Sequence, residues 1–336
     1  EDVDGNLWLK QGMNFCCFDP RTERSVRNPA SILRKWGIKG GIDRFFIDSQ
    51  KRVWVKTYDE GLYCYHPKSK KLTLIKYGYS ETELTKEFWV HTIAESNGNL
   101  LLSSSDGDVM CIDGEKGKVL WKDSYMRHNG GQPSQAYYLY VDRNNNYWVL
   151  TTTVFVYDQK EKKWYNTLNS YLTAHGIEAL PEPLQVWDVM MDQRGWLWIA
   201  TDHYGLYVIN PETKEVKQFV NNKFDTTSLS ENTVKRLMLD RNGSMWIGAY
   251  RNGLNQYIEK MVGIKTIEIG DINTTTEDIY GNYWLGTDNR GIIKYMPETG
   301  ESEIYDKARC GFASDIMVAS ASAKDGSGWF GTDNEA

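Results

Sequence analysis

A phrase of the form Asp-x-x-Gly-x-x-Trp recurs along this chain, and no other feature of the sequence restricts the fold as strongly. Its eight copies, some of them incomplete, are marked by Trp8, Trp54, Leu101, Trp148, Trp198, Trp246, Trp284 and Trp329. Successive landmarks are 46, 47, 47, 50, 48, 38 and 45 residues apart. A steady period in the forties, with strand-forming residues in each repeat, is typical of the blades of a β-propeller.

Each repeat has the composition of four short strands, as the two repeats from 186 to 257 show. A strand over 234–239 ends at an Asp, and the turn after it carries Asn and Gly, for which a positive φ costs little. The second strand holds the Trp and continues into small residues at 248–249. A third strand over 205–209 begins at a Gly, and a polar fourth strand covers 215–219. The sequence therefore predicts four-stranded antiparallel units.

A single four-stranded sheet cannot cover both of its faces, so such repeats bury them by stacking sheet on sheet. The recurring Trp is then a structural residue between blades, and the small residues after it allow close approach of strands. Seven intervals predict an all-β fold, a seven-bladed β-propeller of four-stranded antiparallel blades, that occupies residues 1–336 as a single domain.

The two ends of the chain both supply a copy of the second strand, around Trp8 and around Trp329, so one copy is surplus to seven blades. We expect the segment 316–321 to complete the first blade by pairing beside residues 7–10. The surplus copy also indicates that the chain is a fragment of a longer protein with more than one propeller.

Charge and composition argue against several partners and cofactors. The net charge is −6, whereas binding to phosphates requires a basic face, so we expect no nucleic acid partner. No run of 18 apolar residues occurs, and we expect no direct membrane insertion by this segment. The five His residues are scattered without metal-ligand spacing, and no CxxC pair is present. We therefore predict neither a metal nor a cofactor.

Common catalytic motifs are missing from the sequence. We find no GxSxG elbow, GxxxxGK[ST] loop, HExxH helix or GxGxxG fingerprint. The recurrent carboxylates, such as Asp192 and Asp240, fall at hairpin turns, where they commonly bond local backbone amides. We therefore expect no catalytic residues in this chain.

The motif pair D-x-x-G-x-x-W-[IL]-G-T and G-[LI]-x-x-[YF] resembles the two-component regulator propeller repeat. The likeness is clearest over 198–206, 246–254 and 284–292, and it extends over nearly the whole chain. The resemblance implies a non-enzymatic sensor region of a hybrid two-component system, with the histidine kinase and response regulator in other parts of the full-length protein. It also implies a periplasmic location, as part of an inner-membrane protein, and an oligosaccharide ligand of unknown identity.

The same resemblance implies protein partners. These are a neighbouring propeller and an immunoglobulin-like domain of the same chain, and a second copy in a homodimer. Two other functions stay open at the level of sequence. One is an enzyme of the streptogramin-lyase type, whose propeller repeats also contain Gly-x-x-Trp-Phe-Thr, and the other is a purely structural propeller scaffold.

A ligand site is expected in the loops, because the repeat motif itself is structural. In a propeller the B–C loops and the D–A connections open on one face, and here they carry aromatic residues beside Arg, Asn or Asp. This combination suits sugar recognition, in which flat apolar rings are accompanied by charge-assisted hydrogen bonds. The candidate ligand or partner residues on this rim are Trp36, Trp89, Trp187, His203, Tyr204, Tyr250, Arg251, Asn289 and Arg290. The alternative for these side chains is packing of the loops or of a partner propeller.

Overall fold

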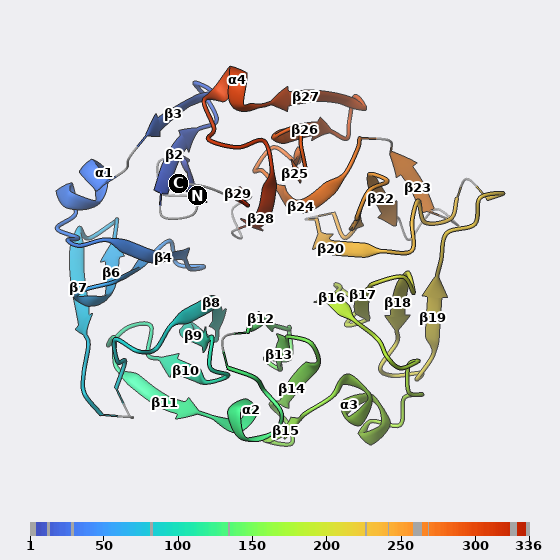
Figure 1. The fold of residues 1–336 in the computed structure, drawn as a ribbon, viewed down its shortest axis with the longest axis horizontal. Coiled ribbons are helices and arrows are strands. Elements are labelled where there is room, and N and C mark those ends of the chain that lie inside the picture. The colour runs from blue at the N-terminus through green and yellow to red at the C-terminus, as the bar shows by residue number, and fades with distance from the viewer. Residues whose placement is uncertain are drawn as a thin grey trace. The chain divides into compact units, whose positions relative to one another are not determined.

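The computed structural model of this chain describes residues 5–11, 14–27, 30–80, 83–133, 135–225, 227–240, 242–257, 264–267, 269–322 and 328–333. Its strands form seven sheets (Figure 1). The chain divides into two compact units, one of Ala30–His175 and the other of Glu1–Pro29 with Gly176–Ala336. We call these the middle unit and the terminal unit, and we letter the strands of each sheet A to D in repeat order.

The middle unit holds three sheets, each a four-stranded antiparallel meander. They are formed by β4 (Ile42–Ile47), β5 (Val53–Thr57), β6 (Gly61–His66) and β7 (Lys71–Lys76), by β8 (Val90–Ser96), β9 (Asn99–Ser104), β10 (Val109–Ile112) and β11 (Val119–Asp123), and by β12 (Tyr138–Val141), β13 (Tyr147–Leu150), β14 (Val154–Asp158) and β15 (Lys163–Tyr165). Short helices precede β4, separate β11 from β12 and follow β15, namely α1 (Ala30–Lys35), α2 (Tyr125–His128) and α3 (Leu168–Ala174).

The terminal unit holds the other four sheets. Three are meanders formed by β16 (Val186–Met191), β17 (Leu197–Thr201), β18 (Leu206–Ile209) and β19 (Val216–Phe219), by β20 (Val234–Leu239), β21 (Met245–Ala249), β22 (Leu254–Tyr257) and β23 (Ile264–Ile267), and by β24 (Ile272–Glu277), β25 (Tyr283–Thr287), β26 (Ile292–Met296) and β27 (Glu301–Tyr305). Helix α4 (Lys307–Cys310) follows β27. The fourth sheet joins β28 (Met317–Ser322) and β29 (Gly328–Thr332) to β1 (Leu7–Gln11), β2 (Asn14–Asp19) and β3 (Arg24–Arg27).

These sheets confirm the fold class predicted from the repeats, an all-β, seven-bladed β-propeller with four-stranded antiparallel blades. The expected pairing at the chain ends was wrong in one respect. Strand β28 does not pair with β1; it pairs antiparallel with β29, which in turn pairs parallel with β1 at Lys10↔Gly331 and Gln11↔Thr332. The surplus copy of strand B therefore lies inside the sheet as a fifth strand. Consecutive strands with a short connection usually pair with each other, and β28 and β29 do so, which leaves β29 as the strand beside β1.

The repeat tryptophans occupy equivalent places on strand B, as predicted. Side chains at four of them are at most 1% exposed and the fifth is 4% exposed, for Trp54, Trp148, Trp198, Trp246 and Trp284. In each case the indole Nε1–H donates to the Asp six residues earlier, over 2.7 to 3.0 Å. The same Asp accepts backbone N–H groups of its own turn, which confirms a structural role for the recurrent carboxylates. The side chain of Trp329 lies outside the described residues.

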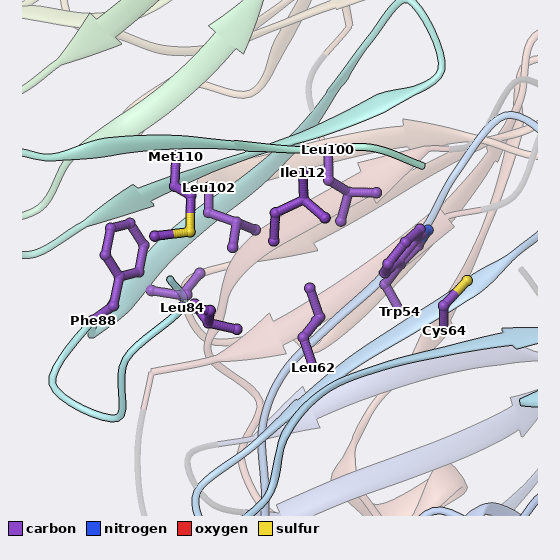
Figure 2. Close-up of a cluster of buried hydrophobic side chains, with 10 residues drawn as sticks. Trp54, Leu62, Cys64, Leu84, Phe88, Leu100, Leu102, Met110 and Ile112 are labelled. Atoms are coloured by element: carbon purple, nitrogen blue, oxygen red, sulfur yellow. The ribbon is translucent and has the colours of Figure 1, made fainter. Parts of the chain in front are cut away.

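The core lies between successive sheets, as Figure 2 shows for the first two sheets of the middle unit. Trp54, Leu62 and Cys64 come from one sheet and face a second group of apolar side chains. That group comprises Leu100, Leu102, Met110 and Ile112 of the next sheet, with Leu84 and Phe88 from the connection between them. The opposite face of the second sheet packs against the third through Leu101, Val109 and Cys111, so both faces of that sheet are removed from water, which is the packing that the repeat predicts.

Small residues after the Trp serve close packing between strands, as expected. A Cβ at Gly286 would lie 2.4 Å from the Cγ2 of Thr274 and 2.7 Å from the Cβ of Met317 on the next sheet. No larger side chain fits there without a shift of backbone, because real Cβ atoms do not approach that closely.

Strand A carries a β-bulge near its start in six of the seven sheets that the structure describes. In β20, for example, Val234 pairs with Ala249 and Arg236 pairs with Gly248, so Lys235 has no partner across the ladder. The residues in this bulge position are Asp43, His91, Trp187, Lys235, Asn273 and Val318. Bulges commonly re-aim side chains at functional sites, so this position is where a site built on strand A is expected.

Candidate functional site

Two bulge residues in the terminal unit, Trp187 and Lys235, begin a cluster at the B–C loop end of their sheets. Strands β16 and β20 are tied together at this point by Asp188, whose Oδ2 accepts the N–H of Leu237 over 2.9 Å. Burial raises the pKa of Asp188, and Arg236 acts in the opposite direction. The backbone N–H of Tyr250 donates to the carbonyl of Thr233 over 2.9 Å, which holds the first residue of the next B–C loop beside β20.

The ammonium of Lys235 lies between two aromatic rings. Its Nζ is 3.1 Å from the ring centroid of Trp187 and 4.8 Å from that of Tyr250. The guanidinium carbon of Arg251 is 5.0 Å from the same Tyr250 ring. Cation–π contacts of this kind contribute about 0.5–2 kcal/mol each, depending on how far the cation is withdrawn from water.

Two carboxylates flank these cations, and both already have partners. Asp202 lies 3.1 Å from His203 Nδ1 and accepts the hydroxyl of Thr233 over 3.2 Å. Glu231 accepts the backbone N–H of Arg251 over 2.8 Å. We call Trp187, Asp202, Glu231, Lys235, Tyr250 and Arg251 the Lys235 cluster.

The ammonium group of Lys235 is partly withdrawn from water. Burial lowers the pKa of Lys235, the neighbouring Arg236 lowers it further, and Asp202 and Glu231 act against both. The two carboxylates therefore do not fully offset the loss of water around the ammonium. A cation so placed gains more from an additional acceptor than an exposed lysine does.

The structure brings some of the predicted rim residues together and leaves others apart. Trp187, Tyr250 and Arg251 meet in the Lys235 cluster, and His203 contacts it through Asp202. Tyr204 follows His203, is 37% exposed, and its carbonyl accepts the Gln218 side chain over 2.8 Å.

The third B–C loop of the terminal unit follows β25. Asn289 and Arg290 are both exposed there. The guanidinium of Arg290 donates to the carbonyl of Ile269 over 3.0 Å, in the connection before β24, so one of its N–H groups already has a partner in the protein. At the bulge of the same sheet, Asn273 donates to Asp288 over 3.1 Å.

The remaining two candidates belong to the middle unit. Trp89 is 56% exposed and its carbonyl accepts the N–H of Ser105 over 2.9 Å, at the B–C loop of its sheet. Trp36 follows α1 and stacks on Tyr65, with ring centroids 4.6 Å apart and planes 10° from parallel. Tyr65 pairs with Val53 at the start of β5, so Trp36 lies toward the A–B turn end of its sheet.

Lys235 is a candidate site residue that the motifs did not predict. It lies on a strand, not in a loop, so a search of loop residues passes over it. One signal was available, because Trp187 and Lys235 are separated by the same 48 residues as the landmarks Trp198 and Trp246. In a superposition of the repeats, Lys235 would occupy the position of Trp187, which is one of the predicted rim residues.

Among the described residues no three His, Cys, Asp or Glu side chains are grouped as a metal ion would require. No helix in the described parts of the chain combines the length and apolar character needed to cross a bilayer.

Comparisons with known proteins identify the repeat and the fold. The model of the two-component regulator propeller family matches residues 228–251, the repeat that contains Lys235 and Trp246, which confirms the resemblance indicated by the motifs. A comparison with curated proteins gives no match.

Solved structures add three likenesses. The extracellular domain of BT4673 from B. thetaiotaomicron, described as a hybrid two component system, is 17% identical with a TM-score of 0.58, over 87% of this chain and 37% of that one. A second structure of that domain, described as a one component system, is 16% identical with a TM-score of 0.50, over 98% and 43%. The propeller domain of Myceliophteria thermophila Cps50 (Swd1) is 9% identical with a TM-score of 0.54, over 84% and 89%. These likenesses establish the fold. The chain spans less than half of the length of the BT4673 extracellular domain in either structure.

Proposed function

We propose that this chain is a non-enzymatic sensor domain of a hybrid two-component system, located outside the cytoplasm, that binds an oligosaccharide. The family match over 228–251 and the fold shared with the extracellular domain of BT4673 support the class of protein. In this proposal the segment lies in the periplasm as part of an inner-membrane protein. It signals by packing against a neighbouring propeller and an immunoglobulin-like domain of its own chain, and against a second copy in a homodimer.

The observation that carries the ligand proposal is the position of Lys235 between Trp187 and Tyr250. Saccharide rings have apolar faces that stack on aromatic side chains, and their hydroxyl groups need donors and acceptors around the rim. The Lys235 cluster offers two rings, two cations and two carboxylates from neighbouring sheets. The exposed ring of Tyr204, in the same unit, is a candidate for a further contact.

The test is calorimetric titration of the protein with the oligosaccharides that a glycan array identifies. The double variant Tyr250→Ala/Arg251→Ala removes one ring and one cation from the cluster. We expect its affinity to fall at least about tenfold, which corresponds to roughly 1.4 kcal/mol. The melting temperature should change little, because both side chains are exposed at the surface.

The matched control is Tyr280→Ala, which removes an exposed tyrosine from the A–B turn of another sheet in the same unit. Its affinity should equal that of the wild type. Equal affinity of the double variant and the wild type would move the site elsewhere. Turnover of an oligosaccharide by the purified protein would replace the sensor with an enzyme.

A further inference from the structure

We infer that the ligand of the Lys235 cluster is an acidic saccharide, one that carries a carboxylate or sulfate group, and that Lys235 and Arg251, the two cations beside Tyr250, bind this group. The inference rests on the proposed function, since it names the chemical class of the oligosaccharide. It is drawn from the pairing of charges within the cluster and from one buried donor.

Two cations of the Lys235 cluster are available to a ligand. Among the described residues, the Nζ of Lys235 makes neither an ion pair nor a hydrogen bond, and its contacts are the two aromatic rings. Within the same described set, the guanidinium of Arg251 has no carboxylate partner and lies over Tyr250. Two cations beside one ring thus keep their hydrogen-bond donors available.

The carboxylates of the cluster have other partners. Asp202 contacts His203 and accepts the hydroxyl of Thr233, and Glu231 accepts a backbone N–H. In the first sheet of the middle unit, by contrast, the bulge residue Asp43 pairs with the buried Lys56 over 2.8 Å. Among the described residues, no carboxylate makes such an ion pair with Lys235.

The cluster also contains a buried donor. Among the described residues, the indole Nε1–H of Trp187 is buried without a hydrogen-bond partner. Leaving such a group unpaired is unfavourable, because its lost hydration is not replaced. An acceptor on a bound ligand would satisfy it.

The cluster also gives the cation a way to reach an anion. The ammonium of Lys235 now covers the face of Trp187. When Lys235 turns toward a carboxylate or sulfate, the Trp187 face becomes available for the sugar ring. An ionised acceptor compensates a desolvated ammonium better than a hydroxyl does, because charge-assisted hydrogen bonds are roughly twice as strong as neutral ones.

The experiment pairs each acidic probe with its neutral counterpart. The probes are a galacturonate tetrasaccharide with its carboxyl-reduced product, and a chondroitin sulfate tetrasaccharide with its desulfated and carboxyl-reduced product. The first pair tests carboxylate alone, and comparison of partly desulfated material in the second pair separates sulfate from carboxylate. We expect at least one acidic probe to bind about tenfold more tightly than its neutral product, a difference that salt reduces.

Lys235→Met keeps the aliphatic stem and removes the charge, so this variant should lose the preference for the acidic probe. Lys235→Arg should keep it, which also guards against a folding defect as the cause. The control Lys217→Met removes an exposed lysine from β19 that lies 3.3 Å from Glu215. Its affinities should equal those of the wild type.

The other outcomes separate this inference from the proposed function. Neutral products that bind as tightly as the acidic probes would overturn the inference and leave an oligosaccharide sensor. An acidic preference that survives in Lys235→Met would overturn the role of Lys235. Binding of no saccharide at all, acidic or neutral, in a glycan array would overturn the proposed function itself.

Discussion

At the scale of single residues, five of the sheets contain a hydrogen-bonded Trp and Asp that are six positions apart. The Trp246 ring is fully buried, and its indole N–H donates to Asp240 over 2.9 Å. Asp240 also accepts the N–H of Ser244 in its own turn and the hydroxyl of Tyr283 from the next sheet, over 2.8 and 2.6 Å. One carboxylate therefore closes the hairpin, satisfies the buried indole and connects two sheets. The spacing of the motif follows from that geometry.

Replacing Trp246 with Ala should lower the free energy of unfolding by roughly 3–5 kcal/mol, as other large-to-small changes in protein cores do. The loss includes the cavity and the unsatisfied Asp240. Urea denaturation followed by circular dichroism measures it. The control is Phe224→Ala, which removes an aromatic ring that is 98% exposed and should change stability by less than about 0.5 kcal/mol. A similar small change for both variants would show that the repeat tryptophan is not a core residue.

The tryptophans could be predicted from sequence because the same Trp and Asp recur at the same spacing in five sheets, and repetition makes the pattern visible. Lys235 could not be predicted from its own residue type. A lysine on strand A, beside Arg236, suggests an exposed strand face, and only the bulge and the two rings from separate segments give it another role. Trp36 differs in the other direction. The sequence suggests that this loop aromatic binds sugar, whereas in the structure its ring stacks on Tyr65.

At the scale of elements, neighbouring sheets are joined by polar contacts as well as by apolar packing. The clearest case in the middle unit is Arg52, whose side chain is 3% exposed. It donates to Asp48 of its own turn over 2.5 Å and to the carbonyls of Gly98 and Gly114 on the next sheet over 3.0 and 2.5 Å. One guanidinium thus holds both the A–B turn and the C–D turn of the adjoining sheet in place. Short-range motifs give no sign of this contact, because its partners are 46 to 62 residues away.

Arg52→Met should cost about 3–5 kcal/mol of unfolding free energy, because it leaves the carboxylate of Asp48 buried without its charged partner. The exposed end of the same network provides the control. Glu115 is 67% exposed and 2.7 Å from Arg52, so Glu115→Gln should cost less than about 1 kcal/mol. Thermal and chemical denaturation of the two variants distinguish these magnitudes. Equal effects would mean that Arg52 contributes no more than a surface ion pair.

At the scale of the whole molecule, the chain ends meet in one sheet of the terminal unit, in the order β28-β29-β1-β2-β3. Two strands from the last repeat and three from the first share a core with the preceding sheet, which includes Trp284, Met317 and Phe330. The repeats predict that the ends combine, since each end lacks part of a blade. The parallel pairing of β29 with β1 could not be predicted from the repeats, because β1 and β29 are both copies of strand B and either could pair with strand A.

A chain that ends at residue 311 would lack β28 and β29, and this truncation tests the closure. Strand β1 would then present an unpaired edge, and the cluster around Trp284 would lose Met317 and Phe330. We expect a broad transition at lower temperature in scanning calorimetry, with growth of light scattering as exposed edges associate. The full chain under the same conditions is the reference. A transition as sharp and as high as that of the full chain would show that these strands do not complete the sheet.

The bulge at the start of strand A has a consequence for how such a protein can change over evolutionary time. A residue with no partner across the ladder can be exchanged without breaking a strand-to-strand hydrogen bond, and the six bulge positions already hold an acid, an imidazole, an indole, an amine, an amide and an aliphatic group. The positions differ in how freely they can change. Asp43 cannot be exchanged alone without leaving the buried Lys56 unpaired. Lys235 makes no ion pair among the described residues, so a single substitution there can alter the chemistry that this end of the sheet offers to a ligand.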